Sequence, residues 1–303
     1  MNRRKVLLGL LAALPLVLPA SAANPQAVAE ARRGPPPDVY ADRKRVLVVA
    51  DLSTGNQSAH MAVSHAISVI EQIGRDSGAY VAFLRTDTDW ITYRETWGTG
   101  DYAQGGPKQA RGKNLHYFDA VVFYTNGELD LDEEQRQALL DFVATGHGFV
   151  GIHTAAVTAG SWPAYAEMLG GKFDNHPWMI SDARIIVERP EFPAMAAMAT
   201  GQTFRDEHYQ MLAAPYSRAN VDVLARLDPR SVDLANPQVH RTDQDFPVAW
   251  IRNYGEGRVF YTGLGHTDAA WDDPRIRTMM REAISWAIDG TEAARPHPIP
   301  PLP

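Results

Sequence analysis

The sequence predicts an α/β protein with an open, mostly parallel sheet and helices on both faces. Short, largely apolar runs such as residues 45–50 are typical of parallel strands that are buried on both sides. Segments with helical spacing of apolar residues alternate with these runs, beginning at residues 63–74. Residues 43–290 are enough chain for one domain of this class.

The first half of the domain follows this alternation. Residues 79–84 and 120–124 are the second and third predicted strands. Asp130 is the predicted N-cap of the next helix, and Glu133, three residues on, completes a capping box. Between these strands, residues 86–116 are polar and rich in Gly and Trp, which is typical of a functional loop or a partly structured insertion.

The second half contains more strands than helices. A fourth strand is predicted at residues 148–152 and a short helix at 162–169. Later strands are predicted at residues 185–187, 221–227, 247–252 and 258–262. Pro274 begins the closing helix, and Gly290 ends it. Ligands of open α/β sheets bind at the carboxyl ends of the strands, so residues directly after each strand are candidates for a site.

Both ends of the chain read as segments outside this domain. Residues 1–22 combine a basic start, an apolar stretch and an Ala-Ser-Ala cleavage site, and they predict a signal peptide. Arg3-Arg4 fits twin-arginine export as well as the general secretory route, so we expect a periplasmic or secreted protein. Residues 23–42 read as a proline-rich linker and 291–303 as a proline-rich tail. We expect no membrane anchor once the signal is removed.

Composition excludes several classes of function. The chain has no cysteine, which excludes disulfides, thiolate metal sites and a cysteine nucleophile. Its formal net charge of -7 argues against a nucleic-acid partner, which would require a basic face. No nucleotide cofactor is expected.

Five histidines occupy positions where a site is expected. His60, His153 and His266 each follow a predicted strand, so the topology places them near one edge of the sheet. His176 and His208 lie on predicted loops. All five are candidate ligands of one divalent metal ion, zinc or manganese. The alternative is that the histidines act without metal, as general acid and base.

Carboxylates accompany the histidines. Asp206 and Glu207 directly precede His208 and supply an acidic group for either chemistry. Because adjacent residues of an extended chain point in opposite directions, these two cannot be the carboxylate pair of an ordinary glycosidase.

Seven segments together resemble the ThuA-like (trehalose utilisation) family. They are residues 146–153 (GHGFVGIH), 170–173 (GGKF), 176–178 (HPW), 206–209 (DEHY), 247–250 (PVAW), 255–262 (GEGRVFYT) and 265–266 (GH). The resemblance extends over roughly residues 44–290. It implies a flavodoxin-like fold similar to class I glutamine amidotransferases, in which His153 stands where those enzymes have their cysteine. Glutamine hydrolysis by that route is therefore excluded.

The resemblance also implies a sugar as the small-molecule partner. The family is linked to disaccharides and to 3-keto sugars, whose carbonyl permits β-elimination of the glycosidic oxygen. We therefore expect a hydrolase or lyase that acts on a disaccharide, a glycoside or its 3-keto derivative; the alternative is a non-catalytic carbohydrate-binding protein. The candidate catalytic residues are His153, Glu207, His208 and His266. The candidate sugar-binding residues are Asp174, His176, Trp178, Asp206, Tyr209, Asp268 and Trp271, although tryptophans serve equally often in cores.

Overall fold

A computed structural model describes residues 38–50 and 62–290 of the chain. The chain divides into two units, Met1–Ala41 and Asp42–Pro303, and the second unit holds every described helix and strand. The predicted signal peptide and tail lie outside the described residues, as do His60 and most of the predicted linker. Within the part of the chain that is described, every helix is too short or too polar to cross a lipid bilayer.

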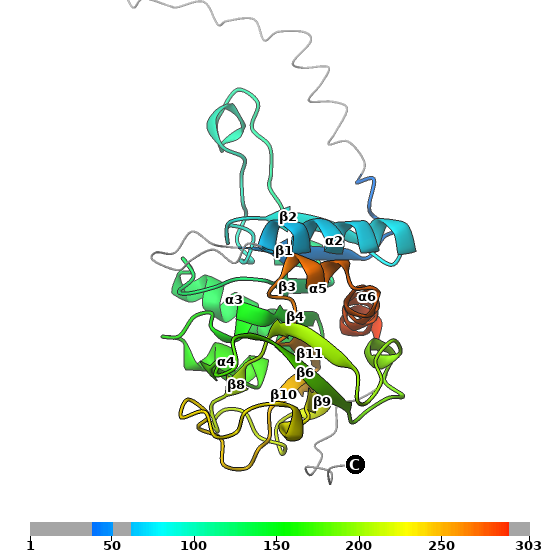
Figure 1. Ribbon diagram of the computed structural model, residues 1–303. Helices are drawn as coiled ribbons and strands as arrows, with labels where there is room; N and C mark the ends of the chain where they lie inside the picture. The colour runs from blue at the N-terminus through cyan, green and yellow to red at the C-terminus, as the bar shows by residue number, and fades with distance from the viewer. Residues whose placement is uncertain (1–37, 51–61, 291–303) are drawn as a thin grey trace, which may run out of the picture. The chain divides into compact units, whose positions relative to one another are not determined.

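Nine of the described strands form one mixed sheet, in the order β2-β1-β3-β4-β11-β10-β9-β6-β7 (Figure 1). The first five run parallel: β2 (Val81–Arg85), β1 (Arg45–Val49), β3 (Ala120–Phe123), β4 (Gly148–Ile152) and β11 (Gly257–Thr262). The others pair antiparallel: β10 (Pro247–Tyr254), β9 (Asp222–Leu227), β6 (Ile180–Val187) and β7 (Thr203–Glu207). A separate pair joins β5 (Phe173–Asn175) to β8 (Gln210–Met211).

Helices cover both faces of this sheet, which confirms the predicted α/β class. On β1, Val46 and Val48 belong to the core cluster beneath α2 (Val63–Ser77) and α6 (Pro274–Asp289). Leu47 and Val49 belong to the cluster beneath α3 (Glu133–Ala144) and α4 (Pro163–Leu169). Successive side chains of a strand point to opposite faces, so an unbroken apolar run is what two covered faces require. A short helix, α5 (Asp268–Asp272), follows β11.

The start of α3 corrects one prediction. Its N-cap is Asp132, whose side chain accepts a hydrogen bond from the Gln135 backbone at 2.9 Å, while the Gln135 side chain accepts one from the Asp132 backbone at 3.1 Å. The capping box predicted at Asp130 and Glu133 is therefore wrong by two residues. The predicted pair and the observed pair have the same spacing of three residues. Leu131 is buried in the core before the helix begins, and this burial selects Asp132 as the N-cap.

Strand β7 is absent from the sequence-based prediction because three of its five residues are charged. Its partner β6 begins five residues earlier than predicted and changes neighbours along its length. The first half of β6 pairs with β7, with Ile180 opposite Glu207, and the second half pairs with β9, with Ile185 opposite Leu227. This change of partner makes β7 the last strand in the order of the sheet, and the carboxyl end of β7 carries Glu207.

Candidate functional site

His153 is the first residue after β4 and adopts an unusual backbone conformation. Its φ is +47°, in the left-handed region that residues other than glycine enter at an energetic cost. The Tyr261 hydroxyl donates to the carbonyl of His153 at 2.9 Å, and Nδ1 of the His153 ring lies 2.7 Å from the carbonyl of Gly263. These contacts fix a strained turn that aims the ring at the edge of the sheet.

Three side chains converge at this point, from the turn after β4, the end of β7 and the loop after β11. Nε2 of His153 lies 3.0 Å from Nδ1 of His266. Oε2 of Glu207 lies 3.3 Å from the first nitrogen and 3.2 Å from the second. We call His153, Glu207 and His266 the histidine–carboxylate cluster.

Asp206 holds the backbone beneath this cluster. Its carboxylate accepts hydrogen bonds from the backbone N–H groups of Gly265 at 2.7 Å and His266 at 3.1 Å. It also accepts one from the N–H of Glu207 at 3.0 Å. The Asp206 side chain is buried, so its oxygens serve the loop and not a bound sugar. This corrects the expectation that Asp206 binds substrate.

Two tyrosines complete the cluster's surroundings. The Tyr209 hydroxyl lies 2.9 Å from Nε2 of His153, and the two rings are stacked with centroids 4.4 Å apart. Tyr124 donates to the carbonyl of Gly265 at 2.7 Å. Burial raises the pKa of both tyrosines well above the ordinary value, so both stay protonated and act as hydrogen-bond donors.

Charge within the cluster is unevenly distributed. Burial by itself would raise the pKa of Glu207, but hydrogen bonds with His153 and His266 outweigh it and bring the pKa far below the usual range. The hydrogen bond with Glu207 raises the pKa of His266. Glu207 is therefore an anion at neutral pH.

The three facing atoms form a donor set suited to a divalent ion. Because Nδ1 of His153 donates to a backbone carbonyl, Nε2 presents a lone pair, as in many metal-binding histidines. Ligands about 2.0–2.1 Å from a tetrahedral zinc ion lie roughly 3.3 Å apart, close to the separations of 3.0, 3.2 and 3.3 Å in the cluster. The ligand atoms all lie within 4.8 Å of one another. The lone pairs of these three ligand atoms repel one another at such short distances. A cation or a shared proton between them removes that repulsion.

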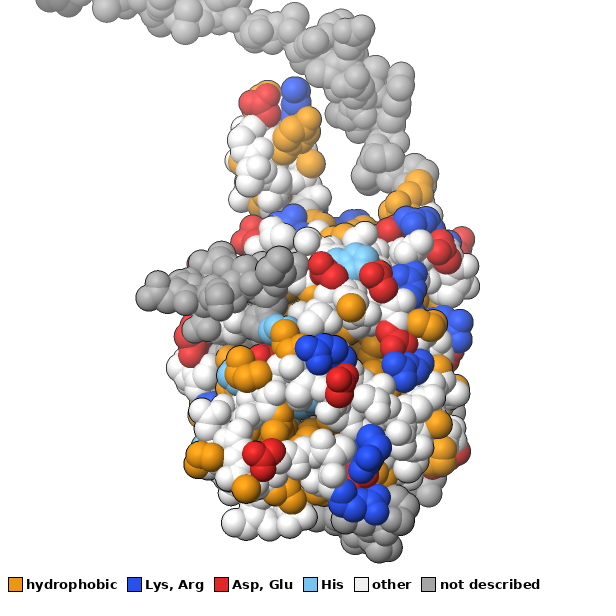
Figure 2. All heavy atoms as spheres, in the orientation of Figure 1, with side chains coloured by type: hydrophobic (Ala, Val, Ile, Leu, Met, Phe, Trp, Pro, Cys, Tyr) orange, Lys and Arg blue, Asp and Glu red, His pale blue; other side chains and the backbone are white. Residues whose placement is uncertain are grey.

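Access to the cluster runs past His266. Its side chain is 23% exposed, against 6% for Glu207 and none for His153. Histidine side chains reach the surface on the face shown in Figure 2, the uppermost between acidic side chains and others beside hydrophobic ones. A ligand therefore meets His266 before the other two residues.

Comparison with known proteins identifies the family. The family model of ThuA, described as trehalose utilisation, matches residues 45–287. The chain belongs to the ThuA family. A crystal structure of a ThuA-like protein from Bacteroides uniformis superposes with a TM-score of 0.62 at 22% identity, covering 84% of this chain and 95% of that one. A ThuA-like protein from Parabacteroides merdae gives 0.57 at 17% identity, covering 85% and 93%. No curated protein sequence matches this chain.

The five histidines predicted as ligands of one metal ion do not all lie together in this ThuA protein. His153 and His266 lie in the cluster, whereas His60 falls outside the described residues. The His208 ring turns to the carbonyl of Ser181, 3.0 Å away, and burial lowers its pKa. The His176 ring packs near Phe173 and Tyr209, and its Nδ1 is buried without a hydrogen-bond partner. His208 and His176 therefore lie outside the group formed by His153, Glu207 and His266, and the roles expected of them stay predictions.

The predicted sugar-stacking tryptophans occupy structural positions. Trp271 is completely buried, and its indole N–H donates to the carbonyl of Gly265 at 2.9 Å. Its predicted contact with sugar is therefore corrected, because no face of the ring reaches solvent. Trp178 packs edge-on against Phe246 and donates to the carbonyl of Asp233.

The remaining predicted residues keep accessible or paired positions. Asp268 is exposed at the start of α5, two residues beyond His266. The Asp174 carboxylate lies 2.8 Å from Nδ1 of His240, a residue that was not among the predicted site residues. Neither Tyr124 nor the carbonyl of Gly263 was predicted, and each lies directly after a strand of the sheet, which is the signal that could have found them.

Proposed function

We propose that this chain is an enzyme that cleaves a glycoside or its 3-keto derivative, with the histidine–carboxylate cluster as its catalytic centre. The observation that carries the proposal is the convergence of two imidazoles and one ionised carboxylate at the carboxyl edge of the sheet. The family's description as trehalose utilisation supports a sugar as substrate.

Elimination from a keto-glycoside needs few groups, and the cluster supplies them. The keto group acidifies the hydrogen on the neighbouring carbon. Glu207 accepts that proton once substrate binding releases it from the hydrogen bonds with the two imidazoles, which otherwise hold its pKa too low for a base. The electron pair of the broken C–H bond forms a carbon–carbon double bond as the glycosidic C–O bond breaks. The leaving oxygen takes a proton from His266, the accessible member of the cluster. Addition of water to the resulting enone completes a net hydrolysis.

A divalent ion would be held by His153, Glu207 and His266. Bound there, zinc or manganese would polarise the keto oxygen of the substrate. Tyr209 orients the His153 ring by stacking on it, a contact that leaves the Nε2 lone pair available to the ion.

We further propose that the protein works outside the cytoplasm, on the strength of the signal-like residues 1–22. The second candidate function is carbohydrate binding without catalysis. The burial of Glu207 and His153 favours this second function. In the unliganded structure only His266 is exposed enough for a ligand to contact it directly, and binding needs no more than that.

Turnover of an aryl 3-keto glucoside and of the parent aryl glucoside, both anomers, tests the proposal through release of the phenol. Each is assayed with metal-free, zinc-loaded and manganese-loaded protein. We expect release by the wild type and loss in Glu207→Gln, with Asp182→Asn, a carboxylate on β6 that is 62% exposed, as the matched control. Saturable binding of these glycosides with no release in any metal state would overturn the enzyme and establish the binding protein.

A further inference from the structure

A second cavity lies away from the histidine–carboxylate cluster, at the base of a projecting segment. Residues 95–113, which we call the arm, stand out beyond β2 in Figure 1. Their base is closed by an antiparallel bridge between Trp97 and Arg111, and η1 (Gly100–Tyr102) lies farther along the arm. The cavity at this base has a volume of about 600 Å³, within the range of small-molecule sites. We call it the arm cavity; none of its lining residues belongs to the cluster.

Aromatic side chains form part of its wall. Trp90 and Trp97 both line the cavity and are both partly exposed. Phe118 stacks against Trp90, and the Arg85 guanidinium lies 4.5 Å from the centre of the Trp90 ring. Arg111 covers one side of Trp97 at 5.5 Å and is not part of the cavity wall. The surface that Trp97 offers to the cavity is therefore a different part of its ring.

The charges of the wall balance. Arg85 and Arg94 are its two basic residues, and Asp89 and Glu95 its two acidic ones. Arg85 lies 3.8 Å from Asp89, and the remaining polar groups are neutral hydroxyls, amides and backbone. A wall of zero net charge gives no advantage to an anion or a cation. Hydrogen-bond donors and acceptors lie side by side in this wall. They suit a ligand rich in hydroxyl groups, because each hydroxyl both donates and accepts hydrogen bonds.

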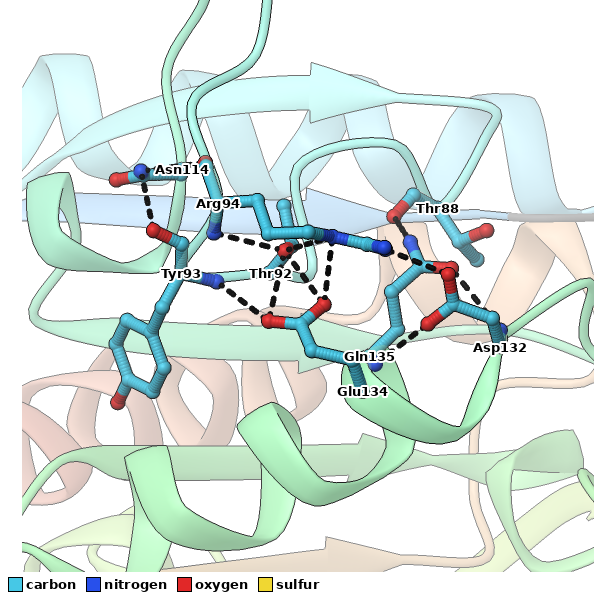
Figure 3. A network of polar contacts seen from close by, with 8 residues as sticks. All are labelled: Thr88, Thr92, Tyr93, Arg94, Asn114, Asp132, Glu134 and Gln135. Carbon is cyan, nitrogen blue, oxygen red and sulfur yellow. Dashed lines mark hydrogen bonds and ion pairs between the residues drawn. The ribbon is translucent and has the colours of Figure 1, made fainter.

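Hydrogen bonds and ion pairs with α3 and its N-cap hold the polar side chains of the cavity wall in place (Figure 3). Arg94 binds Asp132 at 2.6 Å and Glu134 at 3.0 Å, and the Thr92 hydroxyl donates to Glu134 at 2.7 Å. The Gln135 amide donates to the carbonyl of Thr88 at 3.0 Å. Because α3 shares these contacts with residues 88–94, which lead into the arm, the wall is organised before any ligand arrives, which lowers the cost of binding.

We propose that the arm cavity is a binding site for a neutral saccharide, separate from the catalytic centre. Indole surface beside paired arginine and carboxylate groups presents an apolar patch to a sugar ring and hydrogen bonds to its hydroxyls. Both the cavity and the cluster lie after the carboxyl ends of parallel strands, β2 for the cavity and β4 and β11 for the cluster. The saccharide site does not require the cluster to be catalytic.

Calorimetric titration of the full chain with trehalose, sucrose, maltose and cellobiose tests this site, with inorganic phosphate as an anionic probe. We expect at least one disaccharide to bind, and Trp97→Ala to weaken that binding about tenfold or more. Asp89→Asn, at a largely exposed side chain, should weaken binding without affecting folding. Tyr102→Ala, on the arm outside the cavity wall, is the matched control and should bind as the wild type.

His153→Ala separates this proposal from the catalytic one. Saccharide binding that survives His153→Ala but is lost in Trp97→Ala supports the arm cavity even if no turnover is ever found. Binding that is abolished by His153→Ala and unchanged in Trp97→Ala and Asp89→Asn would overturn it. Failure of all four disaccharides to bind the wild type, or binding of phosphate in their place, would overturn it equally.

Discussion

Replacing Asp206 by asparagine tests whether this carboxylate holds the site together. Asp206 accepts three backbone N–H bonds at 2.7, 3.1 and 3.0 Å from a buried position. Asparagine keeps one oxygen and turns an NH₂ group toward a backbone donor. The variant loses at least one charge-assisted hydrogen bond and leaves a buried N–H unpaired, at a cost of about 2–4 kcal/mol in the free energy of unfolding.

Thermal and urea unfolding, followed by tryptophan fluorescence and circular dichroism, measure this cost. For a domain of this size the expected fall in Tm is roughly 5–15 °C. Asp182→Asn is the control, because that carboxylate lies on neighbouring β6, is 62% exposed and meets Arg205 only at 3.5 Å. Its effect should stay within about 0.5 kcal/mol. If Asp206→Asn were as stable as Asp182→Asn, the assigned role of Asp206 would be refuted.

Three further predictions concern the cluster and a buried ion pair. Glu207→Gln should lower turnover of the 3-keto glycoside by about 100-fold or more, as expected for a lost general base, and an unchanged rate would contradict that role. Zinc in excess should raise the Tm of the wild type but not of His153→Ala, and equal shifts in calorimetric scans would exclude the cluster as the metal site. Asp245→Asn should cost about 3 kcal/mol at pH 7, because Arg218 loses one of its two buried carboxylate partners. Burial would raise the pKa of Asp245, but Arg218 outweighs it and lowers the pKa, so this stability is present above about pH 4 and is lost at lower pH. The difference between wild type and Asp245→Asn in urea unfolding should therefore shrink at pH 3, and a constant difference would contradict the assignment.

The candidate site was predicted in part because topology constrains it. His153 and His266 follow β4 and β11, which are paired and parallel, so their carboxyl ends meet whatever the details of packing. Strand β7 lies at the far end of the strand order from β4. Glu207 lies at the same point because β6 pairs with β7 along its first half and with β9 along its second half. No local pattern in the sequence encodes that exchange.

The sequence by itself determined the alternation of strands and helices, because one face of each element must be apolar to be buried. It also determined that two histidines would lie at one edge of the sheet. Only the tertiary structure decided which neighbours complete the cluster: it brought Glu207 to the two imidazoles, turned His208 to a backbone carbonyl and enclosed Trp271 in the core. The physical reason is that strand spacing and apolar periodicity are local properties. The direction of one carboxylate, and the burial of one indole, depend on contacts between residues far apart in the chain.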